Sequence, residues 1–258
     1  MRLKGKVAIV TGGAQGIGRA YCLRFAQEGA AVGIADLRIE QAKAVESEII
    51  KAGGKALAVR ADVSNEESAN AMAKEVYDRF GRVDILVNNA AIYYDMDSKD
   101  QSIAYLRKMI DVNLIGIIIC GRAVFPIMKD QGGGSIINIS SGAAYVLPQP
   151  MKFKASNFST YHYGLTKSGA IYLTKMMAMT GGPYNIRVNA IAPGVTMSEA
   201  TKKVVAPQMI DGLKNVTALG KSLEPWDLTG TAVYLASEDS AMVTGQTIPV
   251  DAGLVMLG

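Results

Sequence analysis

Two residues of a 258-residue chain, Tyr163 and Lys167, have the types and the spacing needed for proton transfer. Because they are four positions apart, a helix through this stretch would place both side chains on one face, one turn apart. The phenol of tyrosine has a reference pKa of about 10, but a neighbouring ammonium stabilises the phenolate and lowers that pKa. The pair could therefore act as a general acid and base.

Tyr-x-x-x-Lys by itself is a short motif, and a tyrosine packed beside a surface lysine produces the same pattern. The neighbouring elements must decide between these interpretations. Ser140 and Ser141 lie upstream, at the end of an apolar run at 135–139 that is typical of a buried strand. They could bring a hydroxyl group to the same place.

A glycine-rich segment near the N-terminus predicts a dinucleotide site. It follows a β-branched, apolar run at 6–10, typical of a buried parallel strand, and precedes apolar residues at helical spacing. Gly12, Gly16 and Gly18 form the pattern Gly-x-x-x-Gly-x-Gly, which differs from the usual Gly-x-Gly-x-x-Gly. Glycines let a pyrophosphate approach the backbone, and the N-terminus of the next helix offers free N–H groups and a positive dipole end.

Asp36 ends a second buried run at 31–35, eighteen positions after Gly18. An acidic residue near this spacing binds the adenosine ribose hydroxyls. Its carboxylate would repel the extra phosphate of NADP, and Gln15 places no compensating base in the glycine loop. Arg38 could accept that phosphate, so the alternative stays open, but Asp36 favours NAD as the cofactor.

Strand-like and helix-like patterns alternate along the chain. Further strands are expected at 56–60, 84–87, 135–139, 186–191 and 247–250, and helices at 40–52, 66–80, 111–129, 163–179 and 225–236. This alternation predicts an α/β fold, a Rossmann-type doubly wound parallel sheet in a single domain spanning 1–258. The less regular stretch 195–224 is expected to form a lid over a site.

Polar amides end or interrupt several apolar runs. Asn88 and Asn89 follow the expected strand at 84–87, at a carboxyl edge where ligands bind in such sheets. Asn113 lies within an apolar stretch, and a buried amide needs partners, so Asn113 is either a structural cap or part of a polar site.

Charge and composition narrow the partners. The 27 Lys+Arg against 23 Asp+Glu give a net charge of +4 with no run of like sign, so neither nucleic acid nor a membrane surface is an expected partner. The apolar run at 114–120 is too short to span a membrane, and the first residues lack a signal-peptide core. The expected partners are small molecules.

Cysteine and histidine usage suggests a reducing compartment and no metal site. Cys22 and Cys120 lie in apolar helical patterns, where buried free thiols are expected, and a cytoplasmic location follows. His162 is the single histidine, so no metal ligand cluster is expected, and its position predicts surface packing.

Taken together, these motifs resemble the short-chain dehydrogenase/reductase family over nearly the whole chain. The matching motifs, in the family's order, are Thr11-Gly12-x-x-x-Gly16-x-Gly18, Asn88-Asn89-Ala90, Asn113, Ser140-Ser141, Tyr163-x-x-x-Lys167 and Pro193-Gly194. Each motif is weak alone, but their joint occurrence in the expected elements is specific.

The resemblance implies a catalytic tetrad of Asn113, Ser141, Tyr163 and Lys167. In the family Tyr163 would exchange a proton with the substrate oxygen, Lys167 would lower its pKa and hold the nicotinamide ribose, Ser141 would bind the substrate oxygen, and Asn113 would order a water. The resemblance also implies a set of cofactor-binding positions: Gly12, Gln15, Gly16, Ile17, Gly18, Asp36, Asp62, Val63, Asn89, Ala90, Tyr163, Lys167, Pro193, Gly194, Thr196 and Ser198.

At three positions this chain has a different small residue from the family pattern, and these replacements are expected to affect the fold and site little. Ala91 and Ala252 replace usual glycines, and Ser198 stands where a threonine often contacts the carboxamide. A larger departure is an insert near 145–160, since Tyr163 follows Ser141 by 22 positions, more than is usual in the family.

The insert should lie near the pocket mouth, where it would help to select the substrate. Its aromatic residues Tyr145, Phe153 and Phe158, with Ile92, Tyr93 and Met197, would make a largely apolar pocket. Lys152 and Lys154 could attract an anionic group of the substrate there, or could form a solvated pair.

The resulting hypothesis is an NAD-dependent oxidoreductase that acts on a secondary alcohol or its ketone. Two alternatives remain: a 3-oxoacyl-carrier-protein reductase, against which Asp36 argues, and a non-catalytic dinucleotide-sensing protein, which would not need the tetrad. The resemblance and the apolar stretch 170–179 further predict a homotetramer.

Overall fold

The computed structural model describes residues 1–92, 100, 102–145, 162–204, 212 and 214–256. Within these residues seven parallel strands form one sheet in the order β3-β2-β1-β4-β5-β6-β7. The strands are β1 (Val7–Thr11), β2 (Ala31–Asp36), β3 (Lys55–Arg60), β4 (Ile85–Asn88), β5 (Gly134–Ile139), β6 (Ile186–Pro193) and β7 (Thr247–Val250). The predicted α/β fold, a Rossmann-type doubly wound parallel sheet, is confirmed.

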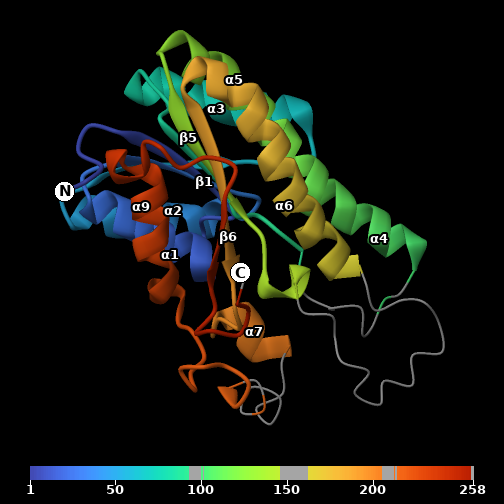
Figure 1. The fold of residues 1–258 in the computed structure, drawn as a ribbon. Coiled ribbons are helices and arrows are strands. Elements are labelled where there is room, and N and C mark those ends of the chain that lie inside the picture. Colours follow the sequence, from blue (N-terminus) through green and yellow to red (C-terminus); the bar gives the residue numbers. More distant parts are fainter. Residues whose placement is uncertain (93–99, 101, 146–161, 205–211, 213, 257–258) are drawn as a thin grey trace.

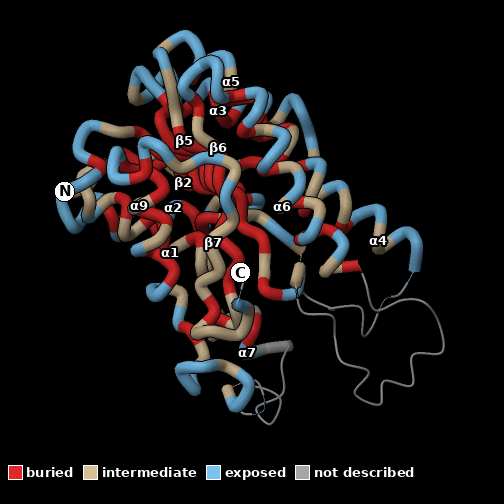
Figure 2. The backbone as a smooth tube through the Cα atoms, viewed as in Figure 1, coloured by how far each residue is buried: buried red, intermediate tan, exposed pale blue. Residues whose placement is uncertain are grey.

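Helices cover both faces of the sheet (Figure 1). One face carries α1 (Gly16–Gln27), α2 (Ile39–Lys51) and α9 (Thr229–Ala236), and the other carries α3 (Glu66–Phe80), α5 (Gly116–Asp130) and α6 (His162–Gly181). Because helices bury both faces, the central strands read as continuous apolar runs rather than alternating ones. Figure 2 shows these strands as the buried centre of the molecule.

The strand order reverses between β1 and β4, so the loops after these strands diverge at the carboxyl edge. In open α/β sheets ligands bind in the crevice outside such a switch point. The loop after β1 is the glycine loop, and β4 ends in Asn88. The fold thus brings the glycine loop and the amides at the end of β4 to the same edge of the sheet.

One helical run is longer than the predicted helix at 111–129. It starts with α4 (Ile103–Ile110), passes through a π-helical turn (Asp111–Ile115) and continues into α5. The earlier start is explained by Ser102, whose Oγ accepts a hydrogen bond of 3.1 Å from the main-chain N–H of Tyr105 and caps the first turn.

The run Ile103–Asp130 is 28 residues long, and its most apolar 18-residue window has a mean hydropathy of 1.8, so its length and composition would allow it to cross a membrane. The sequence interpretation, which considered only 114–120, missed this. In the fold the run packs against α3, α6 and the strands β4 and β5, and 44% of its apolar window is buried, as in the core helix of an α/β protein.

Shorter elements complete the carboxyl side and the connections. They are the 3₁₀ turns Gly142–Ala144, Gly182–Tyr184, Pro225–Leu228 and Glu238–Ser240, and the helix α7 (Glu199–Val204). The predicted helix at 225–236 is therefore a 3₁₀ turn followed by α9. Helix α7 lies in the stretch predicted as a lid.

Candidate active site

Helix α6 is fixed to the end of β5 by a buried lysine, Lys167. The ammonium Nζ of Lys167, 3% exposed, donates a hydrogen bond of 2.8 Å to the carbonyl oxygen of Ile139, the last residue of β5. It lies 5.6 Å from the centroid of the Tyr163 ring. The predicted same-face pair is therefore formed, with the charge held beside the phenol.

The same burial changes the acidity of the lysine. Loss of hydration lowers the pKa of Lys167 from 10.5 to about 8. No carboxylate pairs with this ammonium among the described residues. A buried charge balanced only by a carbonyl oxygen costs folding free energy, which indicates selection for something other than stability.

The two serines after β5 have different surroundings. Ser140 is 2% exposed, and its Oγ donates a hydrogen bond of 2.8 Å to the carbonyl oxygen of Lys167. Ser141 is half-buried, and its Oγ accepts one of 3.1 Å from the N–H of Ala143. Ser140 thus holds α6 in place, whereas Ser141 keeps a hydroxyl hydrogen that no described residue accepts.

Asn113 lies in the π-helical turn and is 1% exposed. Its Oδ1 accepts a hydrogen bond of 2.7 Å from the N–H of Ile92, and its Nδ2 donates one of 3.1 Å to the Ile92 carbonyl oxygen. A longer contact of 3.4 Å joins Nδ2 to Oγ1 of Thr166, which itself donates to the Tyr163 carbonyl at 2.9 Å. These contacts support the structural alternative, because the amide holds Ile92, and a role in a polar site stays a prediction.

The glycine loop is packed against the end of β4. A Cβ on Gly18 would overlap the Gly12 carbonyl and would lie 2.6 Å from Nδ2 of Asn89, so only glycine fits there. Gly12 has φ +64 and packs against Ala90. The Asn89 amide donates to the carbonyls of Thr11 at 2.9 Å and Gly12 at 3.1 Å. Asn89, predicted to bind the cofactor, therefore braces the loop that would do so.

Thr11 was quoted in the motif but not predicted as a site residue. Its hydroxyl accepts hydrogen bonds from the N–H groups of Asn89 at 3.0 Å and Ala90 at 3.1 Å, and donates one to the Val87 carbonyl at 3.2 Å. A polar residue that ends an apolar strand at the carboxyl edge is the signal that could have identified it.

The carboxylate of Asp36 lies at the end of β2, beside the glycine loop. It is buried and accepts hydrogen bonds from the Ala14 N–H at 3.1 Å and from the Arg38 N–H at 3.0 Å. The Arg38 guanidinium pairs with it at 3.2 Å and also donates to Oε1 of Gln15 at 2.7 Å. Arg38, which the sequence analysis considered as an acceptor for the phosphate of NADP, is therefore paired with Asp36.

The remaining predicted positions surround this crevice. Asp62, after β3, accepts hydrogen bonds from Ser64 N–H and Oγ at 2.9 and 2.6 Å. Val63 is buried where a Cβ on Gly116 would lie 3.0 Å from it. Ile17, in the first turn of α1, is partly buried against the hydrophobic core. These contacts are structural, and cofactor binding by Asp62 and Val63 stays a prediction.

The chain after β6 returns to the glycine loop. Pro193 ends β6, and a Cβ on Gly194 would lie 2.7 Å from the Cα of Asp251, so that position is also restricted to glycine. Thr196 is buried and donates to the Gly194 carbonyl at 3.1 Å. The side chain of Ser198 lies 3.4 Å from where a Cβ on Gly16 would stand. The segment predicted to contact the nicotinamide end therefore lies against the loop.

A chain of buried amides, which the sequence analysis did not assemble, joins the cofactor side to α6. Asn88 Nδ2 donates to Oδ1 of Asn138 at 2.9 Å, and Asn138 Nδ2 donates to Oγ1 of Thr174 at 2.9 Å. Thr174 completes the chain with a bond of 2.7 Å to the Ala170 carbonyl. The chain crosses from β4 through β5 to α6, and so fixes the helix that carries Tyr163.

Two expectations need correction. His162 does not pack at the surface: it begins α6 and is 1% exposed. Ala252 is not a neutral replacement of glycine, since its φ of 59° lies in the left-handed region, where a Cβ costs about 1–2 kcal/mol. Ala91, by contrast, is exposed and has no positive φ.

Several expectations concern residues outside the described ones. They are the insert at 145–160 beyond Tyr145, with Lys152, Phe153, Lys154 and Phe158, and also Tyr93. Cys22 and Cys120 are buried free thiols, as expected. Among the described residues no group of three or more His, Cys, Asp or Glu side chains could hold a metal ion.

Burial of the Lys167 ammonium generates a prediction about stability. Its folded pKa of about 8 lies below 10.5, so between these values the unfolded chain binds more protons and stability rises with pH. Lys167→Met should raise the free energy of unfolding at pH 7 by up to about 3 kcal/mol, and the gain should shrink as pH rises from 8 to 10.5. Urea unfolding at several pH values measures it.

Lys175→Met, an exposed lysine on the same helix, is the control and should show no such pH dependence. A stability difference between Lys167→Met and the unmodified protein that stays constant from pH 7 to 10.5 would contradict the argument.

Known proteins are similar to this chain over nearly its full length. A family model described as Enoyl-(Acyl carrier protein) reductase matches residues 12–255. An uncharacterized oxidoreductase of Mycobacterium tuberculosis is 41% identical over 254 residues, covering 97% of this chain and 98% of the relative. The 7alpha-hydroxysteroid dehydrogenase of Escherichia coli is 34% identical over 257 residues, covering 98% and 95%.

A solved structure shows the same fold. It is a 7α-hydroxysteroid dehydrogenase complexed with NADH and 7-oxo glycochenodeoxycholic acid, with a TM-score of 0.90 and 33% identity over 100% of this chain and 97% of that chain. Family model, relatives and solved structure each match nearly the whole chain. The chain therefore belongs to the short-chain dehydrogenase/reductase family, and the protein is an oxidoreductase.

Proposed function

We propose that the protein is an NAD-dependent dehydrogenase that transfers hydride between a secondary alcohol, or its ketone, and nicotinamide, with Tyr163 as the general acid and base. The observation that carries this proposal is the buried Lys167 ammonium, held beside the Tyr163 ring at the carboxyl end of β5. A nearby cation favours the phenolate, which makes the tyrosine usable near neutral pH.

A dinucleotide fits the described residues. The glycine loop lies at the switch point of the sheet, and Gln15, at the N-terminus of α1, makes no side-chain capping bond. The first N–H groups of α1 are therefore open to an anion such as a pyrophosphate. When bound, the nicotinamide would supply the hydride chemistry, and the protein supplies position and electrostatics.

Each remaining member of the tetrad has a role that follows from its surroundings. Ser141 has a hydroxyl hydrogen to donate to the substrate oxygen, since its Oγ accepts from Ala143. Lys167 lowers the pKa of the tyrosine and can turn toward the cofactor ribose. Asn113 holds Ile92 with both ends of its amide, so its contribution is to position the loop after β4 and to keep the water-relay site in place.

The substrate that we propose is a hydrophobic, cyclic secondary alcohol or ketone. The described pocket candidates Ile92, Tyr145 and Met197 are mostly apolar and half-buried. A relative and a solved structure, each about one third identical, are named for a hydroxysteroid, and the latter carries a 7-oxo steroid acid. A carrier-protein reductase is the rival within the family, and a panel of alcohols with NAD against an acetoacetyl thioester with NADPH separates the two.

Replacing the proposed acid tests the mechanism. Tyr163→Phe keeps the ring and its packing but removes the proton, so kcat should fall at least about a hundredfold while NAD affinity changes little. Steady-state kinetics on the best alcohol of the panel and a direct titration with NAD measure the two effects. Tyr77→Phe, an exposed tyrosine on α3, should leave both unchanged. Near-normal kcat in Tyr163→Phe would sink the assignment.

Asp36 decides the proposed cofactor. Asp36→Ala removes the ribose acceptor and the charge that repels a 2′-phosphate, and it releases the Arg38 guanidinium to meet that phosphate. The ratio of kcat/KM for NAD over NADP should therefore fall. Arg38→Ala in the same background should restore part of the ratio, and Glu40→Ala, an exposed acid nearby, should leave it unchanged. An unmodified protein that already prefers NADP overturns the proposal.

We further propose a homotetramer in which α6 forms a self-complementary interface. Leu165, Tyr172, Met176 and Met179 follow at steps of seven, four and three positions, so they form one stripe along the helix. These side chains are 49, 67, 51 and 79% exposed, more apolar surface than a solvent face normally shows on one helix. A second copy of the chain would cover it symmetrically.

A charge placed in the stripe tests this interface. Met176→Glu should lower the mass measured by light scattering at micromolar concentration, because burying an unpaired carboxylate between two copies is unfavourable. Ile50→Glu, on α2 and 53% exposed, is the matched control and should not change the mass. A monomeric mass for the unmodified protein contradicts the proposal.

A further inference from the structure

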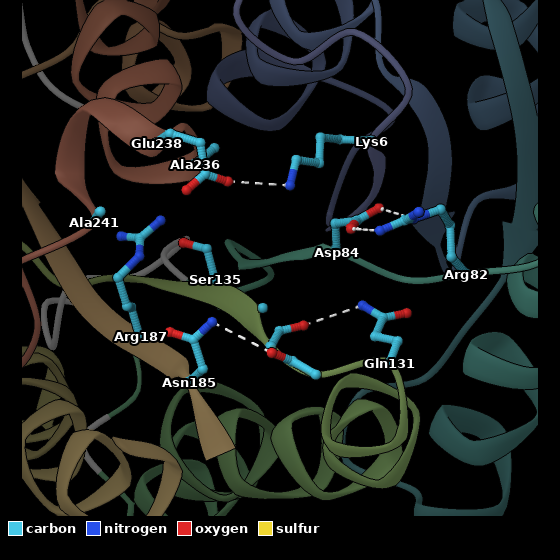
Figure 3. A pocket seen from close by; sticks show the side chains of 13 residues that line it. Lys6, Arg82, Asp84, Gln131, Ser135, Asn185, Arg187, Ala236, Glu238 and Ala241 are labelled. Carbon is cyan, nitrogen blue, oxygen red and sulfur yellow. Dashed lines mark hydrogen bonds and ion pairs between the residues drawn. The ribbon is translucent and has the colours of Figure 1, made fainter. Parts of the chain in front are cut away.

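A polar hollow of about 170 Å³ lies at the amino edge of the sheet, opposite the candidate active site (Figure 3). Its walls come from the starts of four strands and from the chain after α9. Three cations, Lys6, Arg82 and Arg187, and two carboxylates, Asp84 and Glu238, face it. The charges therefore leave an excess of one positive charge.

One of the two carboxylates, Asp84, already accepts three hydrogen bonds. Asp84 is 5% exposed, accepts two bonds of 2.6 and 2.7 Å from the Arg82 guanidinium, and accepts a third of 2.8 Å from the Val7 N–H. Arg82 and Asp84 thus neutralise each other. The excess positive charge belongs to the other side of the hollow, to Lys6 and Arg187.

Arg187 is a half-buried arginine of β6 that the proposed reaction does not use. Its guanidinium donates to the carbonyl oxygens of Leu235 and Ser237 at 3.0 and 3.2 Å and to Oγ of Ser240 at 2.8 Å. All three acceptors are neutral, and among the described residues it forms no ion pair. The C-terminal end of α9 offsets only part of a full charge.

Lys6 faces Arg187 across the hollow, and Glu238 lies between them (Figure 3). The ammonium of Lys6 is paired with Glu238 at 3.2 Å, but the Glu238 side chain is 83% exposed. Such an exposed pair contributes little to stability, so the glutamate can leave at small cost. A small anion from solution that replaced the Glu238 carboxylate would lie near the cations Lys6 and Arg187.

We propose that this hollow is a binding site for a small oxyanion, a phosphate or carboxylate group, held between Lys6 and Arg187 in place of the Glu238 carboxylate. Its volume accommodates such a group with a few waters. Guanidinium and ammonium groups are the side chains that bind phosphate and carboxylate. The site joins the starts of β1 and β6 to the end of α9, so its occupant would stabilise the folded chain by binding it selectively.

Isothermal titration calorimetry with inorganic phosphate tests this proposal, at pH 7 and constant ionic strength set with chloride, with NADH at saturation so that the glycine loop is occupied. The unmodified protein should bind phosphate saturably and should unfold at a higher temperature in its presence. Lys6→Gln should weaken binding about fivefold and Glu238→Gln should strengthen it about fivefold, the factor expected for one unit charge at contact distance in water.

The matched controls are Lys4→Gln and Glu75→Gln, exposed residues outside the hollow, which should leave binding unchanged. Lys6 is chosen over Arg187 because Arg187 also holds the end of α9 and its loss could unfold the protein. A parallel titration with acetate identifies the source: equal binding supports a carboxylate-bearing ligand, and preference for phosphate supports a phosphorylated one. Absence of saturable binding of either anion, or equal losses in Lys4→Gln and Lys6→Gln, overturns the proposal.

Discussion

The hydrogen bond from the buried Lys167 ammonium to the Ile139 carbonyl oxygen ties the reactive helix to the sheet. The bond from Ser140 Oγ to the Lys167 carbonyl runs the other way, and the amide chain through Asn138 and Thr174 repeats the attachment two turns further along. Helix α6 thus cannot slide along β5 without breaking several buried bonds. That constraint fixes where the Tyr163 phenol stands relative to a cofactor bound at the switch point.

Burial of the Lys167 ammonium costs folding free energy. A lysine with only a carbonyl partner is less favourable in the folded protein than a packed apolar side chain would be. No carboxylate in the described part of the chain pairs with this ammonium, so its charge acts on the neighbouring Tyr163 ring. In the proposed mechanism stability and reactivity therefore oppose each other at Lys167, as expected for a functional site.

At each edge of the sheet a buried aspartate accepts a main-chain N–H and pairs with an arginine two positions away. At the carboxyl edge Asp36 accepts a main-chain N–H from the loop after β1 and pairs with Arg38, two positions later. At the amino edge Asp84 accepts the N–H of Val7 in β1 and pairs with Arg82, two positions earlier. In each case the acid links β1 to a neighbouring strand, and the arginine reduces the cost of burying it. The two arginines differ in their neighbourhood. Arg38 lies beside the predicted adenosine site, and Arg82 lines the polar hollow.

The sequence by itself determined the features that depend on local order: the alternation of strands and helices, the glycine loop before α1, Asp36 at the end of β2, and the shared face of Tyr163 and Lys167. Periodicity and turn chemistry act over a few residues, so they can be read from the chain. Only the tertiary structure decided that Ser140 bonds to the Lys167 carbonyl, that Asn113 holds Ile92, that His162 is buried, and that Lys6 and Arg187 line one hollow at the amino edge. Those outcomes depend on side chains from segments distant in sequence, whose partners are set by the order and register of the strands.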